Sequence, residues 1–260
     1  MVARVLVTGS AQGLGRSTAE ELMRRGHRVV VHARNQDRAS ALAALAAQGA
    51  DVVVGDLASQ QQTRDLADQV NQLGRMDAVV HNAGVYAEAQ RFPTAEGHPR
   101  VLAVNVLAPY LLTTLIDRPG RLIYLTSDMH AGGKPTMTDL DWTARRWNGV
   151  QAYRDSKLFL TTLAFAIARY WPQVRSNAVD PGWVPTRMGG PHATDDLELG
   201  YLTQVWLATS DEPSAATSGT YWHHRRHLAA PAAAADPQFQ DTLVDTLAEL
   251  TGTSFPAPTR

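Results

Sequence analysis

A short stretch near the start of the chain restricts its fold more than any other. The run Arg4–Thr8 is apolar and rich in branched residues, which predicts a buried strand. Three glycines follow within Gly9–Gly15, and the next residues, Arg16–Arg25, suit a helix that Gly26 can end. A strand, a glycine turn and a helix N-terminus in this order predict a phosphate-binding site, because the backbone can approach an anion closely and free N–H groups of the helix point at it. The alternative is a structural turn that binds nothing.

The rest of the chain alternates between strand and helix patterns. Runs rich in Val, Ile or Leu predict further strands at Arg28–His32, Asp51–Val54, Asp77–His81, Arg121–Thr126, Val174–Val179 and Gly219–Trp222. Helices are predicted at Gln36–Gln48, Ser59–Leu73, Arg100–Ile116, from the region of Tyr153 to about Trp171, and at Pro237–Leu250. This alternation predicts an α/β fold, with one Rossmann-type domain over residues 1–260 and a doubly wound parallel sheet of about seven strands covered by helices on both faces. An apolar content of 44% is enough for one core.

Composition excludes several classes of function. The chain has no cysteine, so disulfides, thiol catalysis and iron–sulfur sites are excluded. Its net charge is −1 and it has no run of Lys and Arg, which argues against nucleic acid or an acidic membrane surface as a partner. The first strand begins without a charged and then apolar leader, and no apolar run approaches the ~20 residues that span a bilayer. We therefore expect a soluble, cytoplasmic protein with no membrane partner.

Tyr153 and Lys157 are the residues that point to catalysis. They are four residues apart, so on a helix their side chains share one face and can meet. A free Tyr titrates near ~10, and a neighbouring cation lowers that value by favouring the phenolate, which makes a usable general acid/base. The alternative is that the pair simply lies on a solvated helix face.

Six motifs, taken in order, resemble the short-chain dehydrogenase/reductase family. They are Thr8–Gly15 (T-G-x-x-x-G-x-G), His81–Gly84 (the family's N-N-A-G), Asn105 in a Val-Asn-Val run, Ser127 at the end of a strand, Tyr153 with Lys157 (Y-x-x-x-K), and Asp180–Thr186 (containing P-G-x-V-x-T). His81 departs from the family pattern, because it replaces the first Asn of its motif. The Ser-x-x-His run Ser127–His130 further resembles the branch that contains retinol-dehydrogenase-like members.

The resemblance implies an oxidoreductase that transfers a hydride between a nicotinamide cofactor and an alcohol or carbonyl substrate. In such enzymes the residue matched by Tyr153 exchanges a proton with the substrate oxygen, and the one matched by Lys157 lowers the Tyr pKa and binds the nicotinamide ribose. The residue matched by Ser127 donates a hydrogen bond to the substrate oxygen. The residue matched by Asn105 holds a water that links the lysine to solvent. Alternatively, Ser127 only ends its strand and Asn105 only satisfies a buried helix carbonyl.

The same motifs imply the residues that bind the cofactor. They are Gly9, Ser10, Gly13, Leu14, Gly15, Arg34, Asp56, Leu57, Asn82, Ala83, Gly84, Tyr153, Lys157, Pro181, Gly182, Val184 and Thr186. Asp56 and Leu57 match the family's adenine contacts, with an ordinary loop Asp at a strand end as the alternative. The backbone near Val184, with Thr186, matches the segment that fixes the nicotinamide carboxamide.

The end of the second strand indicates which dinucleotide is preferred. An acidic residue there binds the ribose 2′-hydroxyl of NAD, whereas a basic residue accommodates the 2′-phosphate of NADP. Ala33 stands where NAD-using relatives tend to carry Asp, and Arg34, with Arg38 one helical turn away, can grip a phosphate. The glycine turn lacks the extra basic residue of many NADP-preferring relatives. We favour NADP(H), with NAD(H) and a merely solvated Arg34 as the alternatives.

Two loops, near residues 128–152 and 183–200, are expected to bind the substrate. They follow strand ends, where open α/β sheets bind ligands. The loops and the last predicted strand carry large side chains, namely Met129, His130, Trp142, Trp147, Trp183, Met188, His192, Tyr221 and Trp222. These side chains suit a bulky apolar or aromatic carbonyl compound. Alternatively, the tryptophans pack the loops onto the core.

The C-terminal segment 223–260 contains one cluster with metal-like spacing, His223, His224 and His227. On a helix His223 and His227 would share a face, but Arg225 lies between them and no carboxylate or cysteine is near, so we expect a solvated basic loop and no metal site.

Two other classes of function stay open. One is a lyase or epimerase that retains its cofactor, and the other is a non-catalytic NADP-sensing protein. Relatives often pair the helices that match those of Asn105 and Tyr153, which implies a homodimer or homotetramer.

Overall fold

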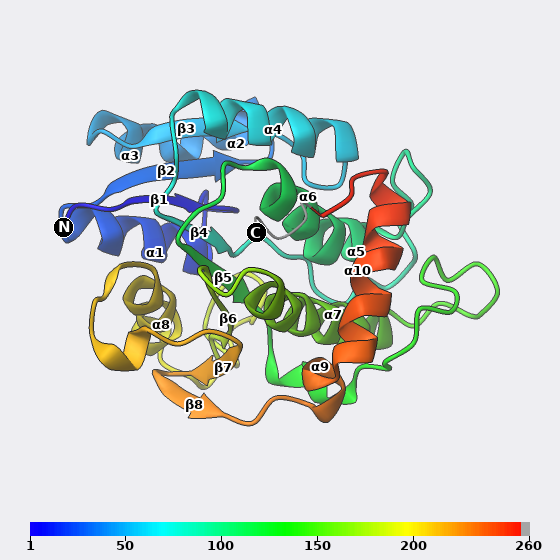
Figure 1. The fold of residues 1–260 in the computed structure, drawn as a ribbon. Coiled ribbons are helices and arrows are strands. Elements are labelled where there is room, and N and C mark those ends of the chain that lie inside the picture. Colours follow the sequence, from blue (N-terminus) through cyan, green and yellow to red (C-terminus); the bar gives the residue numbers. More distant parts are fainter. Residues whose placement is uncertain (256–260) are drawn as a thin grey trace.

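The computed structural model describes residues 1–255, and an eight-stranded sheet forms its centre (Figure 1). The strands are β1 (Arg4–Val7), β2 (Arg28–Ala33), β3 (Asp51–Val54), β4 (Ala78–His81), β5 (Arg121–Leu125), β6 (Arg175–Asp180), β7 (Thr220–His223) and β8 (Arg226–Leu228). Their order in the sheet is β3-β2-β1-β4-β5-β6-β7-β8, with β1 to β7 parallel and β8 antiparallel to β7. The order reverses between β1 and β4, and doubly wound sheets bind ligands at such a switch point.

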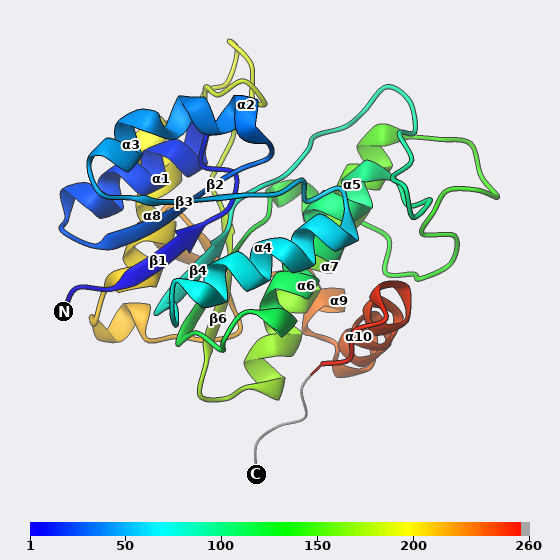
Figure 2. The same cartoon turned by 90° about the horizontal axis from the view of Figure 1, so that it is seen from above.

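The helices form a layer on each face of the sheet (Figure 2). They are α1 (Gly13–Arg24), α2 (Gln36–Ala39), α3 (Ala43–Ala47), α4 (Gln60–Gln72), α5 (Arg100–Leu102), α6 (Ala108–Leu115), α7 (Gly149–Tyr170), α8 (Leu197–Thr209), α9 (Ala232–Ala235) and α10 (Pro237–Thr251). Four shorter turns are η1 (Ser40–Leu42), η2 (Ala103–Leu107), η3 (Asp128–Gly132) and η4 (Pro213–Ala215). Helices α1 and α8 cover one face, and α4, α6 and α7 cover the other.

Alternate strand residues fill two separate cores. Leu6 of β1 belongs to the core under α4, α6 and α7, whereas its neighbours Val5 and Val7 belong to the core under α1 and α8. This alternation follows from the two-residue period of a strand, and burial on both faces explains why the strands read as continuous apolar runs. The two cores fix the sheet between its helix layers, so the ends of its strands form a rigid platform.

The predicted parallel sheet is confirmed, and all seven predicted strands occur within a few residues of their expected bounds. The eighth strand, β8, was not predicted, because its three residues are exposed and form no apolar run. Helix α8 was also missed, and it begins inside the expected loop 183–200. Asp196 caps this helix by accepting a 2.9 Å hydrogen bond from the Leu199 N–H, so an N-cap signal was present in the sequence.

Several predicted helices differ in detail. The segment expected as one helix over residues 36–48 divides into α2, η1 and α3, and the segment 100–116 contains the π-turn η2 around Asn105. Helix α7 begins before Tyr153, at Gly149, where Asn148 caps it. The short helix α9 is not among the predicted helices. Part of the predicted C-terminal segment, residues 256–260, lies outside the described residues.

The chain's last two helices cover α7. Both α9 and α10 pack against it (Figure 1). Arg169 of α7 donates a 3.0 Å hydrogen bond to Gln240 of α10. Tyr110 of α6 donates a 2.8 Å hydrogen bond to the Thr253 carbonyl, which ties the end of α10 to the same layer. Within residues 1–255, no helix has both the length and the apolar character needed to cross a bilayer.

Candidate active site

A cleft of about 880 Å³ lies where the sheet order reverses, at the carboxyl ends of the strands. The residues assigned to catalysis or cofactor binding from the sequence line this cleft, with the exceptions of Ser10 and Asn105. Residues as distant in sequence as Gly9 and Thr186 therefore share one cavity wall. The cleft is formed by the loops that follow β1 to β6, as the parallel topology requires.

The glycine turn has no room for a side chain at Gly9 or at Gly15, where neighbouring backbone lies close. Gly9 has a φ of +69°, and a Cβ there would lie 2.9 Å from the Ala83 Cα. A Cβ on Gly15 would lie 2.5 Å from the Gly9 carbonyl oxygen. Both positions therefore require glycine, and the backbone of the turn forms the surface of the cleft.

The N-terminus of α1 lacks the side-chain cap that the other long helices have. Ser59, Asn148, Asp196 and Asp236 cap α4, α7, α8 and α10, respectively. By contrast, Gln12 at the N-cap of α1 makes no side-chain hydrogen bond to the helix, and the first turn contains no acidic residue. The first N–H groups of a helix need acceptors, and those of α1 open toward the cleft. This helix start therefore fits the pyrophosphate of a dinucleotide.

Thr8 and Asn82 join the glycine turn to the loop after β4. The Thr8 hydroxyl accepts 3.0 Å hydrogen bonds from the N–H groups of Asn82 and Ala83. The Asn82 side chain donates a 2.8 Å hydrogen bond to the Thr8 carbonyl. The Asn-Ala-Gly motif therefore contributes to the site chiefly by holding the turn in shape.

His32 is a site residue that the sequence analysis missed. It is 2% exposed, its Nδ1 accepts a 2.9 Å hydrogen bond from the Gly9 N–H, and its Nε2 lies 2.8 Å from the Gly55 carbonyl oxygen. Because a backbone N–H can only donate, the ring is the neutral tautomer with its proton on Nε2. Burial lowers the pKa of His32, which agrees with a neutral ring. Ser10 is fully buried and accepts a 2.9 Å hydrogen bond from the His32 N–H, so Ser10 joins the glycine turn to β2.

Arg34 and Arg38 lie at the outer end of the cleft, after β2. Within residues 1–255, neither guanidinium takes part in a hydrogen bond or ion pair, so both can bind an anionic ligand. Asn35 accepts a 3.0 Å hydrogen bond from the Arg38 N–H and starts α2, which places Arg38 beside Arg34. Asp56 and Leu57, after β3, line the same end, and the Asp56 carboxylate accepts a 2.9 Å hydrogen bond from the Ala58 N–H.

Ser127, Tyr153 and Lys157 meet in the inner part of the cleft. Burial raises the pKa of the Tyr153 phenol, and the Ser127 hydroxyl opposes that increase. The Lys157 Nζ lies 5.5 Å from the Tyr153 ring centre and donates a 2.8 Å hydrogen bond to the Leu125 carbonyl. The spacing of the two residues predicts that Lys157 lowers the Tyr153 pKa, but in the structure burial dominates and raises it. The phenol is therefore protonated at neutral pH.

Burial also affects the pKa of Lys157. The side chain is 5% exposed, and burial lowers its pKa to about 8, while the Asp180 carboxylate acts in the opposite direction. A cation is unfavourable in a medium of low polarity, and a nearby carboxylate compensates part of that cost.

Asn105 lies behind the cleft wall. It is fully buried in the π-turn η2, where its Oδ1 accepts a 2.8 Å hydrogen bond from the Val85 N–H and its Nδ2 donates to the Val85 carbonyl. Its Nδ2 also donates a 3.0 Å hydrogen bond to the Ser156 hydroxyl. Its side chain thus fixes the backbone after the Asn-Ala-Gly motif. Its predicted part in a water relay stays a prediction.

A sequence model of the short chain dehydrogenase family matches residues 3–196, which is most of the chain. The chain belongs to the short-chain dehydrogenase family. Members of this family are NAD(P)-dependent oxidoreductases, and this chain is an enzyme of that class.

Two named relatives agree with the family assignment. Short-chain dehydrogenase chry4 of Gibberella zeae is 37% identical over 261 residues, which cover 99% of this chain and all of the relative. Human retinol dehydrogenase 13 is 30% identical over 234 residues, which cover 84% of this chain and 70% of the relative. The second match supports the resemblance to the retinol-dehydrogenase-like branch.

Solved structures share the fold of this short-chain dehydrogenase. A crystal structure of a protein from Mycobacterium paratuberculosis gives a TM-score of 0.84 at 27% identity, covering 98% of this chain and 95% of that one. The NADPH-bound carbonyl reductase from chicken fatty liver gives a TM-score of 0.66 at 22% identity, covering 88% and 99% of the two chains.

The mouth of the short-chain dehydrogenase cleft is lined by apolar and aromatic side chains. Met129, Trp183 and Met188, which the sequence placed in substrate loops, line it together with Tyr86, which was not predicted. Tyr86, Trp183 and Met188 are exposed large side chains. Exposed apolar groups gathered at the mouth of a cleft often contact a ligand.

The other large side chains from those loops pack elsewhere. His130, Trp142, Trp147, His192, Tyr221 and Trp222 do not line the cleft. Trp142 and Trp147 pack edge to face with ring centres 5.3 Å apart, and Trp147 donates a 2.9 Å hydrogen bond to the Glu88 carbonyl. Trp222 packs against Trp206 of α8 in the same manner, at 5.1 Å. For these tryptophans the alternative interpretation, packing onto the core, is therefore the one the structure supports.

The histidine cluster lies on a hairpin and not on a helix. His223 ends β7 and pairs with Arg226, while His227 pairs with Trp222, so the two histidines lie on neighbouring strands. The expected basic loop is limited to the turn at His224 and Arg225. His224 is in the turn, at a φ of +47°, and its ring stacks on His223 with centres 3.8 Å apart. Within residues 1–255, no group of three or more His, Cys, Asp or Glu side chains could hold a metal ion.

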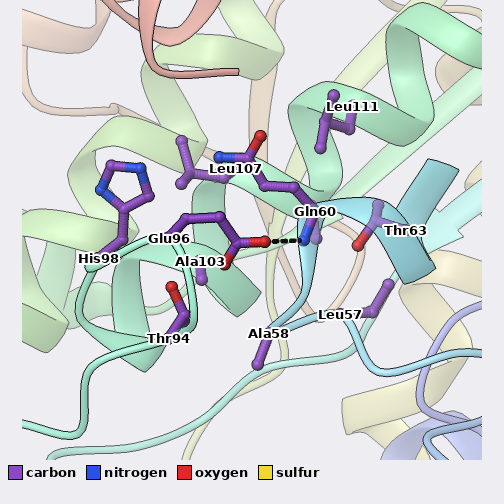
Figure 3. Close-up of a pocket in the computed structure, with 11 residues that line it drawn as sticks. Leu57, Ala58, Gln60, Thr63, Thr94, Glu96, His98, Ala103, Leu107 and Leu111 are labelled. Carbon is purple, nitrogen blue, oxygen red and sulfur yellow. Dashed lines mark hydrogen bonds between the residues drawn. The ribbon is translucent and has the colours of Figure 1, made fainter. Parts of the chain in front are cut away.

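A second depression, between the start of α4 and the α5–α6 segment, is not a ligand site (Figure 3). The Glu96 carboxylate points into it and accepts a 2.9 Å hydrogen bond from the Gln60 N–H (Figure 3). Glu96 thus helps to cap α4, and hydrogen bonds to its carboxylate lower its pKa although burial opposes them. The space that remains is too small for a water molecule.

Proposed function

We propose that the protein transfers a hydride between NADP(H) and an alcohol or carbonyl substrate, and that it works chiefly as an NADPH-dependent carbonyl reductase. One observation carries this proposal: Ser127, Tyr153 and Lys157 meet in the cleft that also contains the uncapped start of α1. A proton donor and a phosphate-binding helix end in one cavity are what cofactor-dependent carbonyl reduction requires.

Each of the three residues in the inner part of the cleft has a role that its position supports. The bound nicotinamide supplies or accepts the hydride. Tyr153, kept protonated by burial, donates its phenolic proton to the substrate oxygen during reduction and takes it back in oxidation. Ser127 lines the same part of the cleft and donates to the same oxygen as negative charge develops there. Lys157 hydrogen-bonds the nicotinamide ribose, and its ammonium stabilises negative charge near Tyr153.

The loop after β6 orients the nicotinamide carboxamide. Val184 is 4% exposed, and its carbonyl accepts a 2.8 Å hydrogen bond from the Thr186 N–H, so this segment is a tight turn. The Thr186 hydroxyl accepts a 3.2 Å hydrogen bond from the Gly189 N–H and can still donate to a ligand. Pro181 and Gly182 complete the wall between this turn and β6.

The preference for NADP(H) over NAD(H) rests on the outer end of the cleft. Arg34 and Arg38 present two cations where the 2′-phosphate lies in dinucleotide folds, and Ala33 offers no carboxylate to a free 2′-hydroxyl. The fold neighbour from chicken fatty liver also binds NADPH. Adenine would lie against Asp56 and Leu57.

The substrate is a bulky apolar or aromatic carbonyl compound. Tyr86, Met129, Trp183 and Met188 form the mouth of the cleft and offer aromatic and thioether surfaces to a large ring system. A small polar substrate would leave these groups in water.

A panel of aromatic and aliphatic carbonyl compounds, followed by the loss of NADPH absorbance, tests the proposed activity. We expect turnover with one NADPH consumed per carbonyl reduced, and faster turnover of the bulkier compounds. A Tyr153→Phe variant should lose about 10²–10⁴-fold in kcat while still binding NADPH. Conversion of substrate without net consumption of NADPH would instead indicate a lyase or epimerase that retains its cofactor, and binding without any conversion would indicate a cofactor sensor.

Pairing of the helices that contain Asn105 and Tyr153 between subunits stays a prediction. In the structure α9 and α10 already cover part of α7, so pairing between subunits is restricted to the surface that they leave free (Figure 2). Light scattering coupled to gel filtration would distinguish a monomer from a homodimer or homotetramer.

A further inference from the structure

Asp180 ends β6 and contributes a buried carboxylate to the wall of the cleft. It is 6% exposed. Its Oδ1 accepts a 2.9 Å hydrogen bond from the Gly182 N–H, and its Oδ2 accepts a 3.2 Å hydrogen bond from the Tyr221 hydroxyl. The Nδ1 of His223 lies 3.3 Å from the same Oδ2. The hydrogen bonds from the Gly182 N–H and the Tyr221 hydroxyl therefore fix the orientation of this carboxylate.

The sheet register places Asp180 close to the Lys157 ammonium. The ammonium donates to the Leu125 carbonyl, and Leu125 of β5 is paired with Val179 of β6, the residue before Asp180. Neighbouring strands lie about 4.8 Å apart, so the end of β6 is next to the carbonyl that holds the ammonium. The Asp180 charge raises the pKa of Lys157, whereas burial lowers it.

We propose that Asp180 is a positioning residue that keeps Lys157 in its ammonium form at the edge of the cleft, where it can hydrogen-bond a ribose hydroxyl and support Tyr153. The part about the ribose and Tyr153 rests on the proposed function, whereas the effect of Asp180 on the charge of Lys157 does not. The Gly182 N–H and the Tyr221 hydroxyl hold the carboxylate in the wall of the cleft. A neutral residue at position 180 would leave the Lys157 cation buried with a carbonyl as its acceptor, which favours the uncharged amine.

Other titratable groups surround this pair. They are Tyr153 of α7, Asp128 and His130 of η3, and Tyr221 and His223 of β7. Burial lowers the pKa of His130 to about 4 and raises the pKa of Tyr221, so both are uncharged near neutral pH. The charge of Asp128 acts on Tyr153, His130 and Tyr221, whereas among the described residues Asp180 is the charged group that acts on Lys157.

The composition of the chain allows a direct test. Lys134 and Lys157 are its two lysines, so ¹³C-lysine labelling gives two Cε signals, and a Lys134→Arg variant identifies the signal of Lys157. The cofactor-free protein is titrated from about pH 6 to about pH 11, around the ordinary lysine pKa. We expect a Lys157 midpoint of about 8 in the wild type. Asp180→Asn should lower that midpoint by about one pH unit or more.

Two control variants separate the effect of the Asp180 charge on the Lys157 midpoint from a general disturbance of the cleft. Asp128→Asn removes a carboxylate from the same cleft and should leave the Lys157 midpoint unchanged. Asp180→Glu keeps the charge and should keep the midpoint closer to that of the wild type than Asp180→Asn does. Circular dichroism checks that each variant is folded. If Asp180→Asn does not fold, Asp180→Ser replaces it, because a Ser hydroxyl can still accept the Gly182 N–H.

An unchanged or raised Lys157 midpoint in Asp180→Asn overturns the proposal, and so does an equal shift in Asp128→Asn. Activity gives a second measurement, since the decrease of kcat/KM at high pH should move to lower pH in Asp180→Asn by the same amount as the midpoint. If the midpoint moves but no carbonyl compound is reduced, the proposed function fails and the role of Asp180 in charging Lys157 stands. If reduction occurs and neither quantity moves, the proposed function stands and the role of Asp180 fails.

Discussion

The rings of Tyr86 and Tyr153 pack edge to face, with centres 4.8 Å apart and planes at 72°. Tyr153 is buried, whereas Tyr86 is 43% exposed at the mouth of the cleft. The Tyr86 hydroxyl also lies 4.0 Å from the Met129 sulfur. Tyr86 therefore forms a wall directly beside the proposed proton donor, in a place where a substrate ring can contact it.

Replacing Tyr86 should change substrate binding more than chemistry. In Tyr86→Ala, we expect KM for a bulky aromatic carbonyl compound to rise about 10-fold, because an aromatic contact of roughly 0.5–1.5 kcal/mol and its buried area are both lost. The kcat should fall much less. Steady-state kinetics with one aromatic and one small aliphatic substrate checks this, with Tyr86→Phe as the control that keeps the ring. A similar loss for both substrates, or a loss in kcat alone, would contradict the role of Tyr86 in specificity.

The activity should decline as the pH rises through about 8. The Lys157 pKa is lowered to about 8, so its ammonium is present below that pH and is lost above it. The pKa of Tyr153 is raised, so the phenol stays protonated across the same range and does not cause the decline. The measurement is kcat/KM for carbonyl reduction between about pH 6 and about pH 10, a range that includes the lowered lysine pKa. Constant activity up to pH 10 would show that a charged Lys157 is not needed.

Stability should decrease when the pH falls below about 6.5, the ordinary pKa of histidine. Burial lowers the pKa of His32, that of His81 to about 3 and that of His130 to about 4. Below pH 6.5 the unfolded chain binds protons at these positions and the folded chain does not, so acid favours the unfolded state. Each such histidine contributes a slope of up to about 1.4 kcal/mol per pH unit to the free energy of unfolding until the folded-state pKa is reached.

A His81→Asn variant isolates one of these contributions. His81 is 2% exposed and stacks on Tyr124 with ring centres 4.7 Å apart, and its Nε2 lies 3.2 Å from the Thr113 hydroxyl. Asn is the residue that the family motif has at this position and does not titrate. Urea denaturation at about pH 7 and about pH 5 should show a smaller pH effect in the variant, by about 1 kcal/mol or more. An equal pH effect in both proteins would mean that folding does not lower the pKa of His81.

The repeating features of the fold could be read from the sequence, because buried parallel strands require apolar runs and helices require caps and ends. Two of the missed features, β8 and His32, lack such a signal. Strand β8 has three exposed residues, and only its pairing with β7 makes it a strand. His32 lies in the middle of an apolar run, and its hydrogen bonds to Gly9 and Gly55 join segments that meet only when the sheet forms.

The site was predicted best where a motif is local. The residues of the glycine turn, of the Tyr-x-x-x-Lys pair and of the loop after β6 do line one cleft. The direction of the Tyr153 pKa was not predictable, because spacing on a helix shows which cation is near but does not show how deeply the phenol is buried. Tyr86 and Asp180 could not be recognised for a related reason. The ring contact of Tyr86 with Tyr153 and the effect of the Asp180 charge on Lys157 depend on the packing of separate segments.

Calorimetric titration of the protein with NADPH and, separately, with NADH tests the proposed cofactor site most directly. We expect micromolar binding of NADPH, at least about 10-fold weaker binding of NADH, and a loss of about 10- to 100-fold in NADPH affinity in Arg34→Ala, the range for a hydrogen bond to a charged phosphate. Arg28→Ala, which removes an exposed arginine at the opposite end of β2, should bind NADPH as the wild type does. Equal or tighter binding of NADH would contradict the role of Arg34, and no binding of either cofactor would contradict the oxidoreductase function itself.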